Sequence, residues 1–520
     1  MDKRIERNIY LNRLIDSMGN GMIKIVTGVR RSGKSFLLFT LFVEWLKSHG
    51  VDDAHIIQVD LEDRLNMKLR NPDALLEHIY SHILDDGNHY VLLDEVQMVP
   101  EFEDVLNSFL KKKNVDVYVT GSNAKFLSKD VITEFRGRGE EISMKPLSFS
   151  EFMSAYEGSY ELGLDEYMTY GGLPQVLSFR TEKEKAEYLK GLFSKTYITD
   201  IVDRYGVKND SELGELLDIV ASCIGSLTNP TKIANTFASI KNVKITNETV
   251  SRWLEYLCDS FLVAKAVRYD VKGRKYIDTP SKFYFSDLGL RNARLNFRQN
   301  EKTHLMENLI YNELIYRGYN VDVGVVVTEV KDEEGKRHKV QLEIDFVCNQ
   351  GSKRIYIQSA YRMPTEEKVA QEQLSLTKVD DSFKKVVIVG EDQLTHRNDK
   401  GIVTMSLREF LLNINSLEEY SNEHLTVSQT NTTVMSEGLQ RDARTIEENS
   451  KDVDGDAVSI SEYQRKIISR IRENPSITPR ELSLQLGVAE RVLNKDLEDL
   501  QQKKLLKRIG GRKTGYWQIL

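Results

Sequence analysis

The sequence predicts an α/β protein: a parallel sheet with a glycine-rich loop, then helical and winged-helix segments, a second α/β domain and a terminal winged helix. Three observations favour this class. Short apolar strands alternate with helices over 21–147, an order that gives a parallel sheet covered on both faces. A glycine-rich loop follows the first strand, and a later apolar strand ends in two adjacent acids. Both lie where α/β sheets bind ligands.

The first elements follow from the spacing of apolar residues. Residues 1–20 have an amphipathic pattern and predict an N-terminal helix. Strands are expected at 22–27, 55–59, 90–93 and 115–120, and helices at 35–48 and from Asn71-Pro72 onward. Together they predict one parallel-sheet domain over 21–147.

Five further segments differ in pattern. They are a helical segment (148–210), a winged-helix-like segment (211–300), a mixed α/β segment (301–415), a linker (421–457) and a second winged helix-turn-helix (458–520). The second of them has helices followed by a β-ribbon, as winged helices do. The linker has no aromatic residue and carries eight acids against three bases, which predicts disorder.

Composition excludes several classes of protein. The chain has 520 residues, 40% hydrophobic and 29% charged, unlike collagen-like, disulfide-rich or wholly disordered chains. With a net charge of −7, any nucleic-acid surface must be a local patch. Cys223, Cys258 and Cys348 form no CxxC pair, so free thiols are expected rather than a zinc cluster. Without an apolar run of membrane-spanning length or a signal-peptide pattern, we expect a cytoplasmic protein with no membrane partner.

The loop at 28–35 reads Gly-Val-Arg-Arg-Ser-Gly-Lys-Ser and fits GxxxxGK[ST] between a strand and a helix. Its amide groups would surround phosphate oxygens, Lys34 would reach the β- and γ-phosphates, and Ser35 would ligate Mg²⁺. The expected nucleotide-binding residues are Gly28, Val29, Arg30, Arg31, Ser32, Gly33, Lys34 and Ser35. The alternative, a glycine-rich turn that happens to contain Lys-Ser, does not account for the acids described next.

The strand at 90–93 is followed by Asp94 and Glu95. Asp94 is expected to hold Mg²⁺ through water, and Glu95 to orient or deprotonate the attacking water. With Lys34, these residues predict ATP and Mg²⁺ as cofactors and ATP hydrolysis as the activity.

Two further positions are candidates for completing the site. Ser122 and Asn123 follow the strand at 115–120 and could sense the γ-phosphate, or Asn123 could simply cap a helix. Arg136 and Arg138 alternate with glycines and could act as an arginine finger, in the same chain or from a neighbouring copy in a homo-oligomer. The alternative for this pair is an exposed basic turn.

Six segments together resemble the AAA-type P-loop ATPases of bacteria and archaea that carry a C-terminal domain of unknown function. The segments are GVRRSGKS, YVLLDEVQ, TGSNA, FRGRG, LSFSEF and YGGLPQV. The resemblance runs from about residue 5 to about residue 415. It implies an AAA-like core, a winged-helix segment and a restriction-endonuclease-like fold.

The segment 301–415 contains the layout of PD-(D/E)XK nucleases. Glu307, Asp345 and Gln358 occupy the metal-binding positions of that layout. Ala360 stands where the layout requires lysine, and Lys368 on the following helix is the one substitute considered. Nuclease activity is therefore not expected, and a structural relic or a DNA-docking fold is the favoured interpretation.

DNA is the expected partner of residues 458–520. This segment contains thirteen basic and seven acidic residues, and its basic Gly-Gly hairpin resembles a wing. A second DNA contact is considered over 231–275, with Lys244, Ser251 and Arg252 beside the candidate recognition helix and a basic turn at 272–275. Winged helices also dock proteins, so a protein partner stays open for both segments.

These observations lead to one favoured function and two alternatives. The favoured one is an ATP-binding, Mg²⁺-dependent AAA-like ATPase that engages DNA through winged helices. One alternative is a nucleotide-gated switch that binds a protein partner and no DNA. The other, less favoured because of Ala360, is an ATP-dependent nuclease.

Overall fold

The computed structural model describes residues 4–121, 137–208, 210–241, 244–299, 301–331, 337–418 and, within 467–519, isolated positions and two strands. The chain divides into two compact units, 1–426 and 427–520. In the ranges just given, no helix has the length and apolar character needed to cross a membrane.

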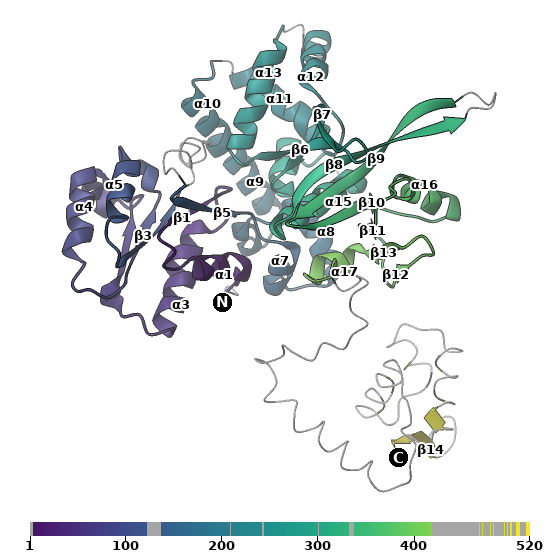
Figure 1. The fold of residues 1–520 in the computed structure, drawn as a ribbon, viewed down its shortest axis with the longest axis horizontal. Coiled ribbons are helices and arrows are strands. Elements are labelled where there is room, and N and C mark those ends of the chain that lie inside the picture. The colour runs from purple at the N-terminus through teal and green to yellow at the C-terminus, as the bar shows by residue number, and fades with distance from the viewer. Residues whose placement is uncertain are drawn as a thin grey trace. The chain divides into compact units, whose positions relative to one another are not determined.

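The N-terminal sheet has parallel strands in the order β2-β3-β4-β1-β5 (Figure 1). The strands are β1 Ile23–Gly28, β2 Ile56–Asp60, β3 His89–Asp94, β4 Val115–Thr120 and β5 Gly139–Met144. The prediction of a parallel α/β sheet is confirmed. Strand β5 was missed because this edge strand is only half buried and has no continuous apolar run.

Helices cover both faces of this sheet. Along β3, Val91 and Leu93 join the core beneath α4 and α5, whereas Tyr90 and Leu92 join the core beneath α1 and α3. This alternation explains why every residue of β3 is apolar or buried. The helices are α1 Asn8–Asp16, α2 Lys34–Phe36, α3 Val43–Ser48, α4 Pro72–Ser81 and α5 Phe102–Phe109.

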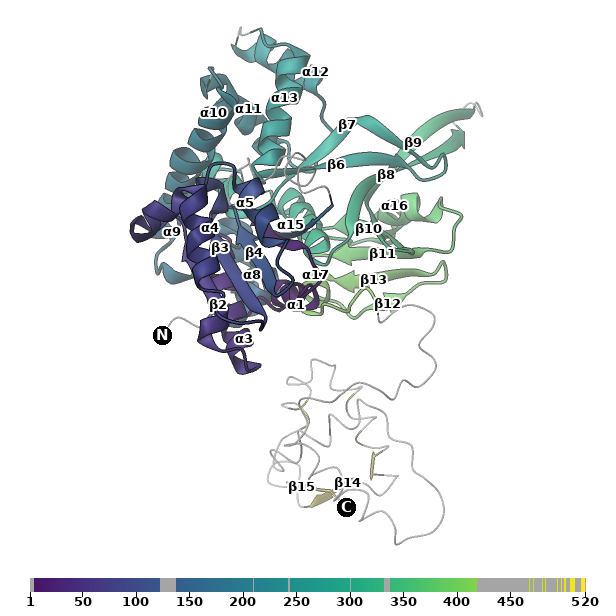
Figure 2. The ribbon, with the colours of Figure 1, turned by 60° about the vertical axis from the view of Figure 1, so that its left-hand side comes forward.

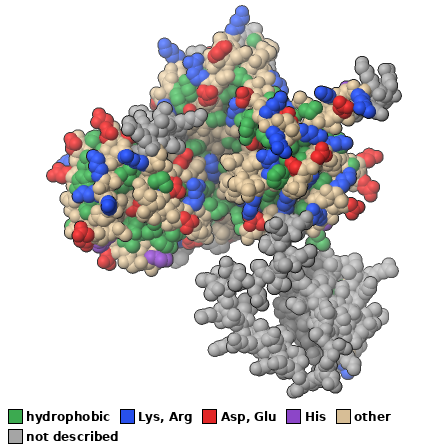
Figure 3. Space-filling view, viewed as in Figure 1, with side chains coloured by type: hydrophobic (Ala, Val, Ile, Leu, Met, Phe, Trp, Pro, Cys, Tyr) green, Lys and Arg blue, Asp and Glu red, His purple; other side chains and the backbone are tan. Residues whose placement is uncertain are grey.

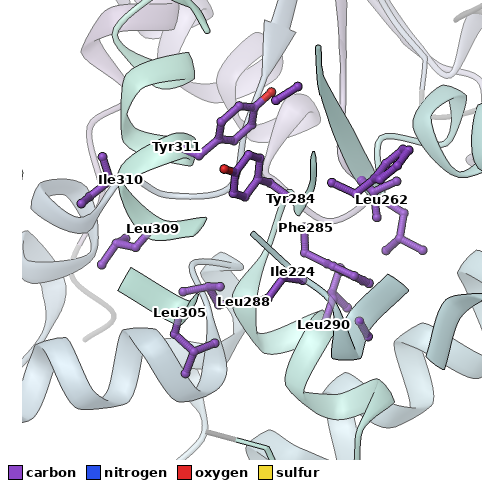
Figure 4. Close-up of a cluster of buried hydrophobic side chains, with 14 of the residues drawn as sticks. Ile224, Leu262, Tyr284, Phe285, Leu288, Leu290, Leu305, Leu309, Ile310 and Tyr311 are labelled. Carbon is purple, nitrogen blue, oxygen red and sulfur yellow. The ribbon is translucent and has the colours of Figure 1, made fainter. Parts of the chain in front are cut away.

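A group of helices follows the sheet in the chain. One sequence motif shows how such a helix begins. In the LSFSEF segment, the Ser148 hydroxyl accepts from the Glu151 amide while the Glu151 carboxylate accepts from the Ser148 amide, which starts α7. The helices are α7 Phe149–Ala155, α8 Tyr160–Tyr170, α9 Glu182–Leu192, α10 Thr199–Tyr205, α11 Asp210–Ser222, α12 Pro230–Thr236, α13 Asn247–Asp259, α14 Leu288–Arg294 and α15 Lys302–Tyr316. Figure 4 shows part of their shared core, where the rings of Tyr284 and Tyr311 stack with centroids 4.2 Å apart.

The second sheet has the order β12-β13-β11-β10-β9-β8-β6-β7. Its elements are β6 Val263–Asp270, β7 Lys275–Phe285, β8 Asn320–Lys331, β9 Arg337–Gln350, β10 Lys353–Ala360, α16 Glu366–Thr377, β11 Lys384–Val389, β12 His396–Arg397, β13 Ile402–Ser406 and α17 Leu407–Leu412. Figure 2 shows the β6–β7 ribbon continuing this sheet, and β6 pairs with β8 in parallel. The ribbon expected as a wing is therefore also an edge of the 301–415 sheet.

The C-terminal unit is described by itself. Strands β14 Leu506–Ile509 and β15 Tyr516–Ile519 pair antiparallel, as the expected hairpin requires. The described buried side chains form one apolar cluster: Ile467, Ile471, Leu482, Leu493, Leu497, Leu500, Leu506 and Trp517. The linker expected at 421–457 lies outside the described residues.

Candidate nucleotide-binding site

The glycine-rich loop connects β1 to α2 at the carboxyl edge of the sheet. Gly28 has φ +130°, and a Cβ there would overlap the carbonyl oxygen of Met144 on β5. Gly33, which precedes α2, has φ +96°. Both positions need glycine because the backbone adopts positive φ and, at Gly28, because a neighbouring strand is too close for a side chain.

Lys34 is buried beside this loop. Its Nζ donates to the carbonyl oxygens of Gly28 (3.1 Å) and Val29 (3.2 Å). Burial lowers the pKa of Lys34 to about 8, although Glu95 and Asp94 act in the opposite direction. The ammonium therefore lies in the loop, close to both acids at the end of β3.

Asp94 and Ser35 meet at the position expected for the metal ligands. The Asp94 carboxylate is buried and accepts hydrogen bonds from the hydroxyls of Ser35 and Thr120. Burial raises the pKa of Asp94, and these two hydrogen bonds oppose the rise. One carboxylate and one adjacent hydroxyl are oxygen ligands of the type that Mg²⁺ takes, so the donor set fits this ion.

Glu95 follows in a left-handed conformation with φ 52°. Its amide donates to Thr120 Oγ1 (3.1 Å), and its carboxylate accepts from Gln97 Nε2. Thr120 thus ties the end of β3 to the end of β4. It was missed in the sequence, although its place as the last residue of a strand adjacent to β3 was a usable signal.

One residue outside the motif, Arg7, also holds the loop. Arg7 is buried, donates to the carbonyl oxygens of Ser32 (3.2 Å) and Lys145 (2.6 Å), and pairs with Glu151 at 3.2 Å. It belongs to a segment where the sequence showed only an amphipathic helix, so nothing in the local pattern identified it.

Arg30 connects the loop to the group of helices that follows the sheet. Its Nε lies 2.7 Å from Asp200 Oδ2 on α10. Burial raises the pKa of Asp200, and Arg30 opposes this shift. The nucleotide loop is thus joined by an ion pair to a helix far along the chain.

The structure does not bring all candidates together. Ser122, Asn123 and Arg136 lie outside the described residues. Arg138 precedes β5, and its carbonyl accepts from Ile23 at the start of β1. That is the amino edge of the sheet, so Arg138 lies a strand length of roughly 17 Å from the loop. As a finger it could serve only a neighbouring copy.

A second charged cluster is formed by side chains of β7, α15 and β9. Lys282 of β7 places Nζ 2.8 Å from Glu307 Oε1, 2.7 Å from Glu343 Oε1 and 3.6 Å from Asp345 Oδ1. Burial disfavours its charge, but the three carboxylates together raise the pKa of Lys282. Burial raises the pKa of Asp345 to about 7, while Lys282 acts to lower it.

Lys282, rather than Lys368, is the cation of this cluster. Lys368 pairs with Glu372 on its own helix and is not the substitute cation. The cation comes instead from β7, and Ala360 is a buried apolar residue. Gln358 lies beside Asp345, whose amide donates to Gln358 Oε1 (3.4 Å). Lys282 could not be linked to this cluster from the sequence, because it lies in the ribbon assigned to the winged-helix-like segment 211–300.

The bases considered for DNA contact lie on and beside α13. Lys244, Arg252 and the turn at 272–275 are exposed, and Ser251 is half-buried. Thr246 caps α13 by accepting from the Thr249 amide at 3.2 Å. Figure 3 shows Lys and Arg interspersed with acids on the face in view, without a continuous basic stripe.

Two family models match the chain: an AAA domain over residues 20–153 and a domain of unknown function (DUF8612) over 161–301. An uncharacterized Haemophilus influenzae protein is 32% identical over 393 residues, covering 74% of this chain and 94% of its own length. An uncharacterized Methanocaldococcus jannaschii protein is 27% identical over 390 residues, covering 72% and 86%.

Solved structures are similar at a lower level. The Aeropyrum pernix ORC1 protein in complex with DNA is 14% identical, with a TM-score of 0.28, and covers 57% of this chain and 94% of its own. Drosophila ORC bound to AT-rich DNA and Cdc6 is 10% identical, with a TM-score of 0.19, and covers 56% and 91%.

Proposed function

We propose that this chain, which belongs to the same protein family as the uncharacterized Haemophilus influenzae relative and carries an AAA domain over 20–153, binds ATP with Mg²⁺ and hydrolyses it. The observation that carries the proposal is the meeting of Lys34, Ser35 and Asp94 at one edge of the sheet. These residues come from the start of α2 and the end of β3, and together they supply a cation, a hydroxyl and a carboxylate to the same place.

Each residue has a role that its surroundings support. Loop amides would bind phosphate oxygens, and Lys34 would exchange its two carbonyl partners for the more strongly charged phosphates. Ser35 and Asp94 would hold Mg²⁺, which supplies charge neutralisation for phosphoryl transfer. Glu95, fixed through its amide by Thr120, would orient the attacking water.

The test is steady-state ATP hydrolysis by the full-length protein. Lys34→Ala should reduce turnover to the rate of buffer alone. Glu95→Gln should retain ATP binding but lose turnover by about 10²–10⁴-fold. Lys111→Ala removes an exposed lysine of the same domain and should leave ATP binding and turnover unchanged. Wild-type hydrolysis at the buffer rate would refute the proposal.

We further propose that the ATPase engages DNA. Support comes from exposed Lys244 and Arg252 beside α13, from the basic turn at 272–275, and from the base excess of 458–520. The turn joins two paired strands, as a wing does. ATP hydrolysis measured with and without duplex DNA tests the link, because DNA can raise the hydrolysis rate only if its binding affects the nucleotide site.

A nucleotide-gated protein switch is the second candidate, and the pair of Arg30 with Asp200 favours it. The phosphates of ATP would compete with Asp200 for Arg30, so binding would release α10 from the loop. Hydrogen exchange of α10 with and without ATP tests this. Exchange that changes with ATP, together with an ATPase rate indifferent to DNA, would favour the switch over the DNA-linked enzyme.

A further inference from the structure

A second group of metal-type ligands lies at the opposite end of β3 from Asp94. His55, Asp85 and His89 each offer one nitrogen or carboxylate oxygen, and these ligand atoms all lie within 4.8 Å of one another. The group is at the amino edge of the sheet, so it is separate from the nucleotide site.

The fold brings the two histidines together by strand register. His55 precedes β2 and His89 begins β3, and the parallel pairing sets Ile56 opposite Tyr90. The imidazole rings are therefore lateral neighbours, with centroids 4.7 Å apart and planes inclined by 41°.

The turn that carries Asp85 is held in place by hydrogen bonds. Asn114 Nδ2 donates to the carbonyl oxygens of Asp85 (3.1 Å) and Gly87 (3.3 Å). The His89 amide in turn donates to the Asn114 carbonyl at 2.8 Å. The three candidate ligands are thus fixed by the backbone of two strands and one anchored turn.

The hydrogen bonds of His89 leave one ring nitrogen as an acceptor. Nδ1 lies 2.8 Å from the Gly87 carbonyl and must donate to it, so Nε2 carries the lone pair. A backbone carbonyl on one nitrogen is the usual outer partner of a metal-binding histidine. Nε2 accepts a long hydrogen bond of 3.3 Å from the Leu84 amide. His89 is fully buried.

Asp85 and His55 complete the group. Asp85 Oδ1 accepts from the Gly87 amide (2.7 Å) and lies 3.2 Å from His55 Nε2. Gly87 has no positive φ, yet a Cβ there would lie 2.8 Å from Asp85 Oδ1 and 2.9 Å from His55 Nε2. The backbone would accept another residue, so glycine keeps open the space between the two ligands.

We propose that His55, Asp85 and His89 bind a divalent transition-metal ion, with Zn²⁺ as the expected ion. Two imidazole nitrogens and one carboxylate oxygen suit Zn²⁺ better than Mg²⁺, which prefers oxygen ligands alone. Three protein ligands leave a fourth tetrahedral position for water. The ion would link β2, β3 and the turn at 84–89.

Cobalt titration of the untagged, chelator-treated full-length protein tests the site. Co²⁺ should bind with a tetrahedral ligand-field absorption band that one equivalent of Zn²⁺ removes. His55→Ala should weaken binding by at least about tenfold, as should Gly87→Ala, which keeps all three ligands but fills the space. Zn²⁺ should raise the Tm of the wild type but not of Gly87→Ala.

The matched control is the histidine pair at the C-terminal end of α4. His78 and His82 lie one helical turn apart, with ring centroids 4.4 Å apart, and could bind the same metal. His78→Ala should leave Co²⁺ affinity unchanged. Loss of binding in His78→Ala, unchanged binding in His55→Ala, or no absorption band in the wild type would overturn the proposal and leave His55 and Asp85 as a hydrogen-bonded pair.

Discussion

Two buried lysines show how the surroundings of single residues set their chemistry in this protein. Among the described residues, the hydrogen-bond partners of the Lys34 ammonium are two neutral carbonyl oxygens, and burial lowers its pKa. Lys282 contacts carboxylates directly, and its pKa is raised despite burial. The first cation is available to an incoming anion, whereas the second is already neutralised within the fold.

Lys34 is expected to make the proposed ATP binding depend on pH. Its pKa in the folded protein is about 8, so the ammonium loses its proton as the pH rises through that value. A neutral amine attracts phosphates weakly, and ATP binding must then take up a proton. We expect the Kd for a fluorescent ATP analogue to rise between pH 7.5 and 9.5, by roughly tenfold per pH unit above the pKa.

Lys34→Arg is the control for this dependence because guanidinium stays charged over the whole range. Its affinity should show no step near pH 8, even if it is lower throughout. A step of equal size in both proteins would assign the pH dependence to the nucleotide or to another residue.

Lys282→Met should destabilise the second sheet, because it leaves Glu307, Glu343 and Asp345 facing one another without a cation. We expect the free energy of unfolding in urea to fall by about 3–5 kcal/mol at pH 8. The loss should be smaller at pH 5.5. Burial already raises the pKa of Asp345 to about 7, and its protonation at the lower pH relieves the repulsion.

Lys265→Met on β6 provides the matched comparison, since Lys265 is exposed on the neighbouring strand. It should change stability by less than about 0.5 kcal/mol. An equal loss for Lys282→Met at both pH values would mean that lost packing, rather than unpaired charge, dominates.

At the scale of elements, α10 and the phosphate loop are joined by Arg30 and Asp200. Both side chains are about one-third exposed, so solvent screens the pair. Such a contact holds two elements together weakly, which suits an interaction that ATP is proposed to break.

Asp200→Asn should therefore increase ATP affinity by about two- to fivefold, because Arg30 no longer has a carboxylate competing with the phosphates. Asp203→Asn removes an exposed acid from the same helix and should have a smaller effect. Equilibrium binding of a fluorescent ATP analogue measures both variants. Equal gains would indicate that net charge alone, not the ion pair, controls affinity.

For the whole molecule, the candidate nucleotide site belongs to the first compact unit and the C-terminal base excess to the second. Removing residues 458–520 should weaken duplex DNA binding, measured by fluorescence anisotropy. It should also reduce the slope of log Kd against log salt, because fewer phosphates are neutralised. ATP hydrolysis without DNA should persist. Unchanged DNA affinity and slope would place DNA binding in the first unit.

The sequence by itself determined the parallel sheet, the glycine-rich loop, and the placement of Lys34, Ser35, Asp94 and Glu95 at its carboxyl edge. These features are local: a strand, its loop and the next helix are continuous in the chain, and parallel strands end at one edge. Their spacing is visible without knowing any long-range contact.

Only the tertiary structure decided the partners that approach from distant elements. Thr120 reaches Asp94 from a neighbouring strand, Asp200 reaches the loop from a later helix, and Lys282 reaches Glu307 from the ribbon. The pairing of His55 with His89 depends on strand register in the same way. A single sequence contains no spacing rule for such contacts, because strand order and helix packing, not separation along the chain, set which side chains meet.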